Sequence, residues 1–290
     1  MSYYEADILQ DGTGNAKIAH NVIRTYTISL ASSDSAGKNT CPRAMRRSLI
    51  ERMRQRGKTE QQINTWANER GLSMCSDVCV LHYSGRGQMD NVQKARHNLT
   101  NLLFEDRKSF KSALLRRLER IHKDYGSNVA VRPNVDSDIL WERLIPEMFD
   151  FPFYWYDYTK VSKRLGNVPA NYHLTYSVND GSLTEDWQRV YDTDSNIAVA
   201  FDSLWLPSRH RYGYLPAAYT DPNGYTWPVV DGDASDLTFL SPPGTCRGLR
   251  FKGGHDNQAK ARESEFVVPG CGGWDRVPPS EATEGYYIGA

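Results

Sequence analysis

Residues 129–159, VAVRPNVDSDILWERLIPEMFDFPFYWYDYT, decide the fold. They begin with a short apolar run at 129–135, which is typical of a buried strand. A helix-like stretch follows at 136–149, where Asp136 or Ser137 can cap the first turn. The segment ends in an aromatic strand at 151–159. A strand, a helix and a second strand in so short a stretch favour a right-handed βαβ unit with parallel strands.

The same alternation continues on both sides of this segment. Further strands are predicted at residues 24–32, 78–84, 171–178, 196–204, 225–232 and 246–254, and a long amphipathic helix at 91–123. The sequence therefore predicts a single α/β domain over residues 1–290, with a parallel sheet that forms a complete or partial (β/α) barrel. A doubly wound open sheet is the alternative, but no G-x-G-x-x-G motif follows an early strand to support it.

Residues 43–71 predict two short helices that form an insert near the N-terminus. The first half of this insert is strongly basic, with one acidic residue, Glu51. Its cations can neutralise phosphates and are candidates for nucleic-acid binding. These candidates are Arg43, Arg46, Arg47, Arg52, Arg54, Arg56 and Lys58. A merely solvated helix face is the alternative, because the net charge of the whole chain is zero.

Composition and the N-terminal residues predict a globular protein of the cytoplasm. Hydrophobic residues make up 39% of the chain and charged residues 24%. No apolar run is long enough to cross a membrane, and the acidic start MSYYEADILQ lacks the features of a signal peptide. In a reducing compartment the five cysteines are expected to be core residues or metal ligands. The oligomeric state is left open.

Polar residues follow the predicted strands in succession. The carboxyl ends of parallel strands meet at one edge of a sheet, where α/β enzymes gather their catalytic groups. A single aspartate there usually caps a helix, but repetition at successive strands predicts a shared polar pocket. The predicted catalytic residues are Asp136, Asp157, Lys160, Asp202 and Lys252. The predicted cofactor-binding residues are Asn134, Ser177, Asp180 and Asp233.

Three cysteines are candidate metal ligands. Cys75 and Cys79 open the stretch CSDVCVLHYSGRG at 75–87, and Cys41 precedes a proline. Three thiolates that leave one position open can hold a [4Fe–4S] cluster. Zinc is the alternative metal and would need a fourth ligand, for which spacing does not select among His82, His97, Cys246 and Cys271. Burial as plain apolar side chains is the third interpretation.

Several of these motifs resemble the gene-product-88 family of phages and plasmids. The resemblance rests on GNAKI, CPRA, CSDVCVLHYSGRG and NVQKARHNL, and later on VRPNVDSDILWERLIPEM and FYWYDYTK, and covers residues 12–180. The motifs also resemble those of phage proteins related to radical-SAM barrels, where SAM is S-adenosylmethionine. This resemblance implies an iron–sulfur cluster on Cys41, Cys75 and Cys79, with S-adenosylmethionine at the polar strand ends. The chain departs from the family pattern by placing 33 residues between Cys41 and Cys75.

The leading hypothesis is a phage or mobile-element enzyme with a three-cysteine iron–sulfur or metal site. It would act on a nucleotide or a nucleic acid. One alternative is a zinc-containing, base-exchanging transglycosylase-like enzyme with Asp136 or Asp202 as nucleophile. The other is a non-catalytic phage accessory protein that binds DNA or a host protein.

Overall fold

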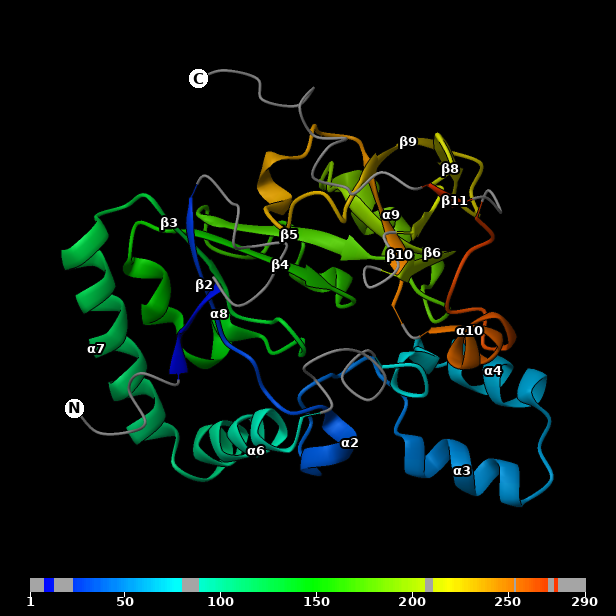
Figure 1. Cartoon of the computed structure of the whole chain (residues 1–290), viewed down its shortest axis with the longest axis horizontal. Helices are drawn as coiled ribbons and strands as arrows, with labels where there is room; N and C mark the ends of the chain where they lie inside the picture. The colour runs from blue at the N-terminus through cyan, green and yellow to red at the C-terminus, as the bar shows by residue number, and fades with distance from the viewer. Residues whose placement is uncertain are drawn as a thin grey trace.

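A computed structural model describes residues 8–12, 23–79, 89–206, 211–252, 254–270 and 274–275 (Figure 1). The strands are β1 (Gln10–Asp11), β2 (Arg24–Thr27), β3 (Val129–Arg132), β4 (Tyr154–Thr159), β5 (Tyr172–Ser177), β6 (Ile197–Leu206), β7 (Arg211–Gly213), β8 (Ala218–Thr220), β9 (Thr226–Asp231), β10 (Cys246–Phe251) and β11 (Trp274–Asp275). The α-helices are α2 (Ser33–Ala36), α3 (Arg47–Gln55), α4 (Glu60–Asn68), α6 (Asp90–Glu105), α7 (Arg107–Tyr125), α8 (Trp141–Leu144), α9 (Thr184–Asp192) and α10 (Gly254–Glu263). Short 3₁₀ helices are η2 (Met74–Ser76), η4 (Pro146–Asp150), η5 (Ser162–Arg164) and η7 (Thr238–Leu240).

The strands form one mixed sheet, in which the neighbours run in the order β1-β2-β3-β4-β5-β6-β10-β9-β8. Every neighbouring pair from β2 to β9 along this path is parallel. The outer strands β1 and β8 pair antiparallel, and β7 and β11 extend the sheet beside β6. The path through the described residues ends at β1 and β8 without closing, so the sheet is open.

The strand order from β2 to β6 follows the order of the chain. Sequential parallel strands of this kind are the connectivity of a (β/α) barrel. Beyond β6 the order is no longer sequential, because β10 lies next to β6 and is followed by β9 and β8. The prediction of an α/β fold with a largely parallel sheet is therefore confirmed, and the sheet does not form a complete barrel.

One face of the sheet packs against α6, α7 and α8. Alternation of side chains along each strand sends Val129, Val131 and Trp155 to this face, where all three are fully buried. The stripe that covers them comes from α7 and consists of Phe110, Leu114, Leu118 and Ile121. We call this side of the sheet the helical face.

The opposite face of the sheet is more polar and carries the other set of alternating side chains. Ala130 and Tyr156 pack there against Leu237, which belongs to the segment between β9 and β10. The Arg132 guanidinium donates two hydrogen bonds of 2.9 Å to Asp236 in the same segment. The segment between β9 and β10 therefore packs on the opposite face through an ion pair as well as through apolar contacts.

Two predicted helices differ from the observed ones. The helix predicted at 91–123 is broken into α6 and α7 at Asp106, whose carboxylate caps α7 by accepting from the Ser109 amide. The helix predicted at 136–149 is reduced to the short α8 and η4. The side-chain oxygen Oδ1 of Asn134 accepts from the Ser137 hydroxyl and the Ile139 amide and holds that stretch in a non-helical turn.

The basic insert forms α3 and α4, as predicted, and has its own small apolar core. Met45, Ile50, Ile63 and Ala67 are buried there with Met74. Thr59 caps α4 with a reciprocal capping box that also uses Gln62. In Figure 1 the insert lies beside α10, and the Asn64 side chain donates to the Glu263 carbonyl at 3.0 Å.

Among the helices of the described residues, none has the length and apolar content that crossing a membrane requires. Most of the strand predicted at 78–84 lies outside the described residues.

Candidate functional site

The parallel strands bring the predicted site residues to one edge of the sheet, which we call the carboxyl edge. Asn134 and Asp136 follow β3, Lys160 follows β4, and Asp180 follows β5. Asp233 and Lys252 follow the neighbouring strands β9 and β10. Asp157, Ser177 and Asp202 lie within the carboxyl-terminal halves of β4, β5 and β6.

Three of the predicted carboxylates at this edge are held in ion pairs. Asp136 lies 2.8 Å from the Arg96 guanidinium, and burial raises its pKa although Arg96 opposes the shift. Asp202 pairs with Arg262 at 2.5 Å. Asp233 is buried and accepts from Lys252 at 2.7 Å. The ion pairs of Asp136 and Asp202 join the carboxyl edge to helices α6 and α10, and the pair of Asp233 joins the residues after β9 to those after β10. The three carboxylates therefore have a structural role.

Asp157 is completely buried on the helical face and holds the turn after β3. Its carboxylate accepts from the amide and side chain of Asn134, each at 3.0 Å, and from the Tyr172 hydroxyl at 2.6 Å. Burial raises the pKa of Asp157 to about 7, although Arg132 and these hydrogen bonds act in the opposite direction. Asn134 is also buried, so the pair serves packing and presents no surface to a ligand.

The raised pKa of Asp157 predicts a pH dependence of stability. Between about pH 4 and pH 7 the unfolded chain releases this proton but the folded site retains it. The free energy of unfolding is therefore expected to fall as pH rises through this window, by an amount on the order of a few kcal/mol. Urea denaturation of the wild type and of Asp157→Asn at several pH values checks this. Equal slopes of stability against pH in the two proteins would contradict it.

Cys41 and Cys75 meet at the carboxyl edge beside Lys160, and we call these three residues the thiol–lysine site. The two ends of the basic insert are joined, because Met45 donates to the Ser73 carbonyl at 2.9 Å and Ser73 donates to the Arg43 carbonyl at 2.7 Å. This pairing removes most of the sequence separation between the two cysteines. The insert therefore leaves and returns at one place in the fold, so the segments that carry Cys41 and Cys75 lie next to each other.

The electrostatics of the thiol–lysine site show that its three groups are neighbours. Burial raises the pKa of Cys41 to about 11, and the adjacent Cys75 adds to this shift. Burial also raises the pKa of Cys75, whereas Lys160 lowers it. For Lys160 burial lowers the pKa, but Cys75, Asp138 and Cys41 outweigh it and leave the pKa raised. Without a further cation the two thiols are therefore protonated at neutral pH.

Lys160 is positioned from both sides. Its amide donates to Asp138 at 2.8 Å, and its ammonium group lies 3.5 Å from the Ser177 hydroxyl. Asp180, also at this edge, accepts from the Ser73 hydroxyl and the Met74 amide, each at 2.6 Å, and thereby fixes the segment that carries Cys75.

The structure brings together only part of the ligand set that a sulfur-binding metal would need. Neither Cys41 nor Cys75 belongs to an apolar cluster, in contrast to Cys246, which is fully buried in the core beside Ile197 and Trp227. Cys79 is half-buried and lies four residues after Cys75 in the chain. Within the described residues no group of three histidine, cysteine or acidic side chains has the geometry of a metal site. Two ligands of the predicted set are together, and the third is near in sequence.

Two of the four candidate fourth ligands, His97 and Cys246, lie within the described residues, and both have other contacts. The His97 ring contacts the Gln93 and Ser35 carbonyl oxygens at 2.7 and 3.0 Å, and Cys246 lies in the core. His82 and Cys271 lie outside the described residues.

Sequence reasoning missed the importance of Asp138 and Arg164. Asp138 accepts from Thr159 at 2.8 Å as well as from the Lys160 amide. Arg164, whose side chain is 1% exposed, pairs with Asp138 at 2.8 Å and with Glu142 at 2.9 Å. The sequence VSKRLG contains no signal that distinguishes the buried Arg164 from its exposed neighbour Lys163.

The predicted nucleic-acid cations of the insert divide into two groups. Arg43 pairs with Asp186 at 2.8 Å, Arg54 pairs with Glu60 and Asp77, and Arg47 lies 4.0 Å from Asp77. These three stabilise the insert. The exposed cations are Arg46, Arg52, Arg56 and Lys58.

Replacing Arg54 with alanine is expected to lower the free energy of unfolding by about 2–3 kcal/mol. The reason is that Asp77, 4% exposed, loses its 2.7 Å partner inside the protein. Arg52→Ala is the matched control on the same helix and should stay within about 0.5 kcal/mol, since Arg52 is exposed. Urea denaturation measures both variants, and equal effects would show that the Arg54 pairs do not stabilise the insert.

These features define the class of the protein: an open, largely parallel α/β protein with a polar site at the carboxyl edge of its sheet. The chain belongs to the gene product 88 family, whose model matches residues 7–270. This confirms the family resemblance and extends it beyond residue 180, through strand β10. No curated protein and no solved structure shows significant similarity to the chain.

Proposed function

We propose that this chain is a phage or mobile-element enzyme whose reaction centre is the thiol–lysine site. Cys41, Cys75 and Cys79 would hold an iron–sulfur cluster or a single metal ion. A cluster held by three thiolates keeps one iron open to a small polar molecule such as S-adenosylmethionine.

The observation that carries this proposal is the meeting of Cys41, Cys75 and Lys160 outside the apolar core. Two thiols of raised pKa are unfavourable as neighbouring thiolates unless a cation neutralises them. A metal supplies that charge, and binding then releases the thiol protons. All three cysteines lie in the connection between β2 and β3, and Cys41 and Cys75 lie at the edge where α/β enzymes place catalytic groups.

A nucleotide or nucleic acid is the substrate class that we propose. Lys160 offers a cation to an anionic group at the site, and Ser177 beside it offers a hydroxyl. The exposed cations of the insert, Arg46, Arg52, Arg56 and Lys58, supply further phosphate contacts. The insert connects directly to both Cys41 and Cys75, which supports its role in bringing a phosphate backbone to this edge.

Anaerobic purification followed by absorption spectroscopy and elemental analysis tests the proposal. Iron and acid-labile sulfide with a broad visible absorption band would support the cluster. Zinc in place of iron would support the transglycosylase-like alternative. Absence of metal after anaerobic reconstitution with iron and sulfide, and with zinc, would contradict the proposal and favour a non-catalytic accessory protein.

A further inference from the structure

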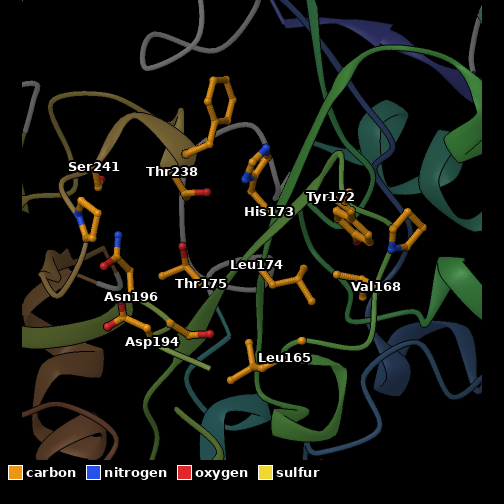
Figure 2. Close-up of a pocket in the computed structure, with 16 residues that line it drawn as sticks. Leu165, Val168, Tyr172, His173, Leu174, Thr175, Asp194, Asn196, Thr238 and Ser241 are labelled. Atoms are coloured by element: carbon orange, nitrogen blue, oxygen red, sulfur yellow. The ribbon is translucent and has the colours of Figure 1, made fainter. Parts of the chain in front are cut away.

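A second site lies at the opposite edge of the sheet. This pocket, which we call the amino-edge pocket, has a volume of about 380 Å³. It is lined by residues that precede β5, β6 and β10 and by residues 172–175 of β5 (Figure 2). Its size lies within the range of small-molecule sites in proteins.

The pocket contains a buried hydroxyl without a partner. Thr238, at the start of η7, is 2% exposed, and its Oγ1 has no hydrogen-bond partner in the part of the chain that the structure describes. Thr175 of β5, 3% exposed, lies on the facing side of the pocket (Figure 2). A buried hydroxyl without a partner costs stability, so a threonine at 238 indicates a ligand that completes its hydrogen bonding.

Aromatic rings form one wall of the pocket. The rings of His173 and Phe239 both line it, with centroids 5.6 Å apart. Phe239 stacks in turn on Tyr154, at 5.2 Å and 10° between the ring planes, and Tyr154 is 43% exposed. Nucleic-acid bases stack on exposed rings of this kind.

The charges of the lining exclude a phosphate group. Asp194 contributes a carboxylate, and the described residues that line the pocket include neither lysine nor arginine. Burial lowers the pKa of His173, so its ring is neutral at neutral pH and offers one donor and one acceptor. A ligand suited to this lining is flat, uncharged and able both to donate and to accept hydrogen bonds. An exocyclic amino group would match the Asp194 carboxylate.

We propose that the amino-edge pocket binds a nucleobase that carries an exocyclic amino group, as part of a nucleoside. The base stacks beside Phe239 and His173, bonds to the Thr238 hydroxyl and donates its amino group to Asp194. The pocket residues His173 and Thr175 lie on the opposite face of the sheet, as does Ser177, whose hydroxyl neighbours Lys160, so strand β5 connects the pocket to the carboxyl edge. The inference agrees with the proposed nucleotide substrate but stands on its own observations.

Isothermal titration of the full chain with adenosine and cytidine tests this proposal. Both are expected to bind, and adenosine 5′-monophosphate should bind no better than adenosine because no cation meets its phosphate. Thr238→Val should weaken adenosine binding about tenfold, the value of one good hydrogen bond. The same variant should melt at an unchanged or higher temperature, because it removes a polar group that lacks a partner.

Thr100→Val is the matched control. The Thr100 hydroxyl is buried but satisfied, since it accepts from the Ala31 amide at 2.9 Å and donates to the Arg96 carbonyl at 2.8 Å. This variant should melt at a lower temperature and bind adenosine as the wild type does.

Absence of nucleoside binding at millimolar concentrations would overturn the inference, as would equal affinity of Thr238→Val and the wild type. Binding of glucose but not of nucleosides would overturn it too. The titration measures nucleoside binding alone, so a negative result does not contradict the metal proposal. In the same way, absence of metal does not contradict nucleobase binding at the amino-edge pocket.

Discussion

Replacing Arg164 with methionine is expected to lower the free energy of unfolding by about 3–5 kcal/mol. Methionine keeps the length of the side chain but removes the charge. Asp138 and Glu142, whose side chains are 11% and 7% exposed, would then remain buried without their cation. Breaking a buried ion pair by removing one partner is costly, because the remaining carboxylates are desolvated and unpaired.

Lys163→Met is the matched control for this prediction. Lys163 is the exposed neighbour of Arg164, and its replacement should change stability by no more than about 0.5 kcal/mol. Urea denaturation at neutral pH measures both variants. If Arg164→Met is as stable as the control, the network that positions Lys160 through Asp138 does not hold the carboxyl edge together.

The second large effect concerns the thiols. Cys75→Ser, and separately Cys41→Ser, should lower the metal content per chain at least about tenfold, because loss of one thiolate from a small ligand set removes much of the affinity. Serine keeps the size of the side chain but is a poor ligand for metals that prefer sulfur. Metal content of anaerobically purified protein, measured by elemental analysis, checks the prediction.

Cys246→Ala separates ligand loss from general damage. Cys246 has the same thiol as Cys41 and Cys75 but is fully buried in the apolar core, where burial raises its pKa to about 12. The variant should keep its metal. Equal loss of metal in Cys246→Ala and Cys75→Ser would mean that stability, and not ligation, governs metal content.

Much of the fold was predictable from local pattern. The aromatic strand β4 and its neighbours alternate with helices, so the parallel sheet and its polar carboxyl edge follow from periodicity and chain order. Where prediction failed locally, a side chain competed with the helix. Asn134 ties down Ser137 and Ile139, and Pro146 then limits the helical turns to α8 and η4.

The candidate site was less predictable than the sheet. Asp136 follows β3 and Asp202 lies in the carboxyl-terminal half of β6, but their partners Arg96 and Arg262 come from distant helices, and no sequence motif identifies them. The family resemblance implied that Cys41 and Cys75 lie together. The structure shows how this happens, because hydrogen bonds join the two ends of the insert. The amino-edge pocket draws on three separate segments, so no single motif reveals it.

The central claim is that Cys41 and Cys75 bind a metal at the carboxyl edge of the sheet. X-ray absorption spectroscopy of the anaerobic, metal-loaded protein tests it most directly, because the fine structure identifies the atoms bonded to the metal. Sulfur ligands, at about 2.3 Å if the metal is zinc, are expected in the wild type and should be lost or depleted in Cys75→Ser. A metal bonded only to nitrogen and oxygen, or identical spectra for the two proteins, would contradict the claim.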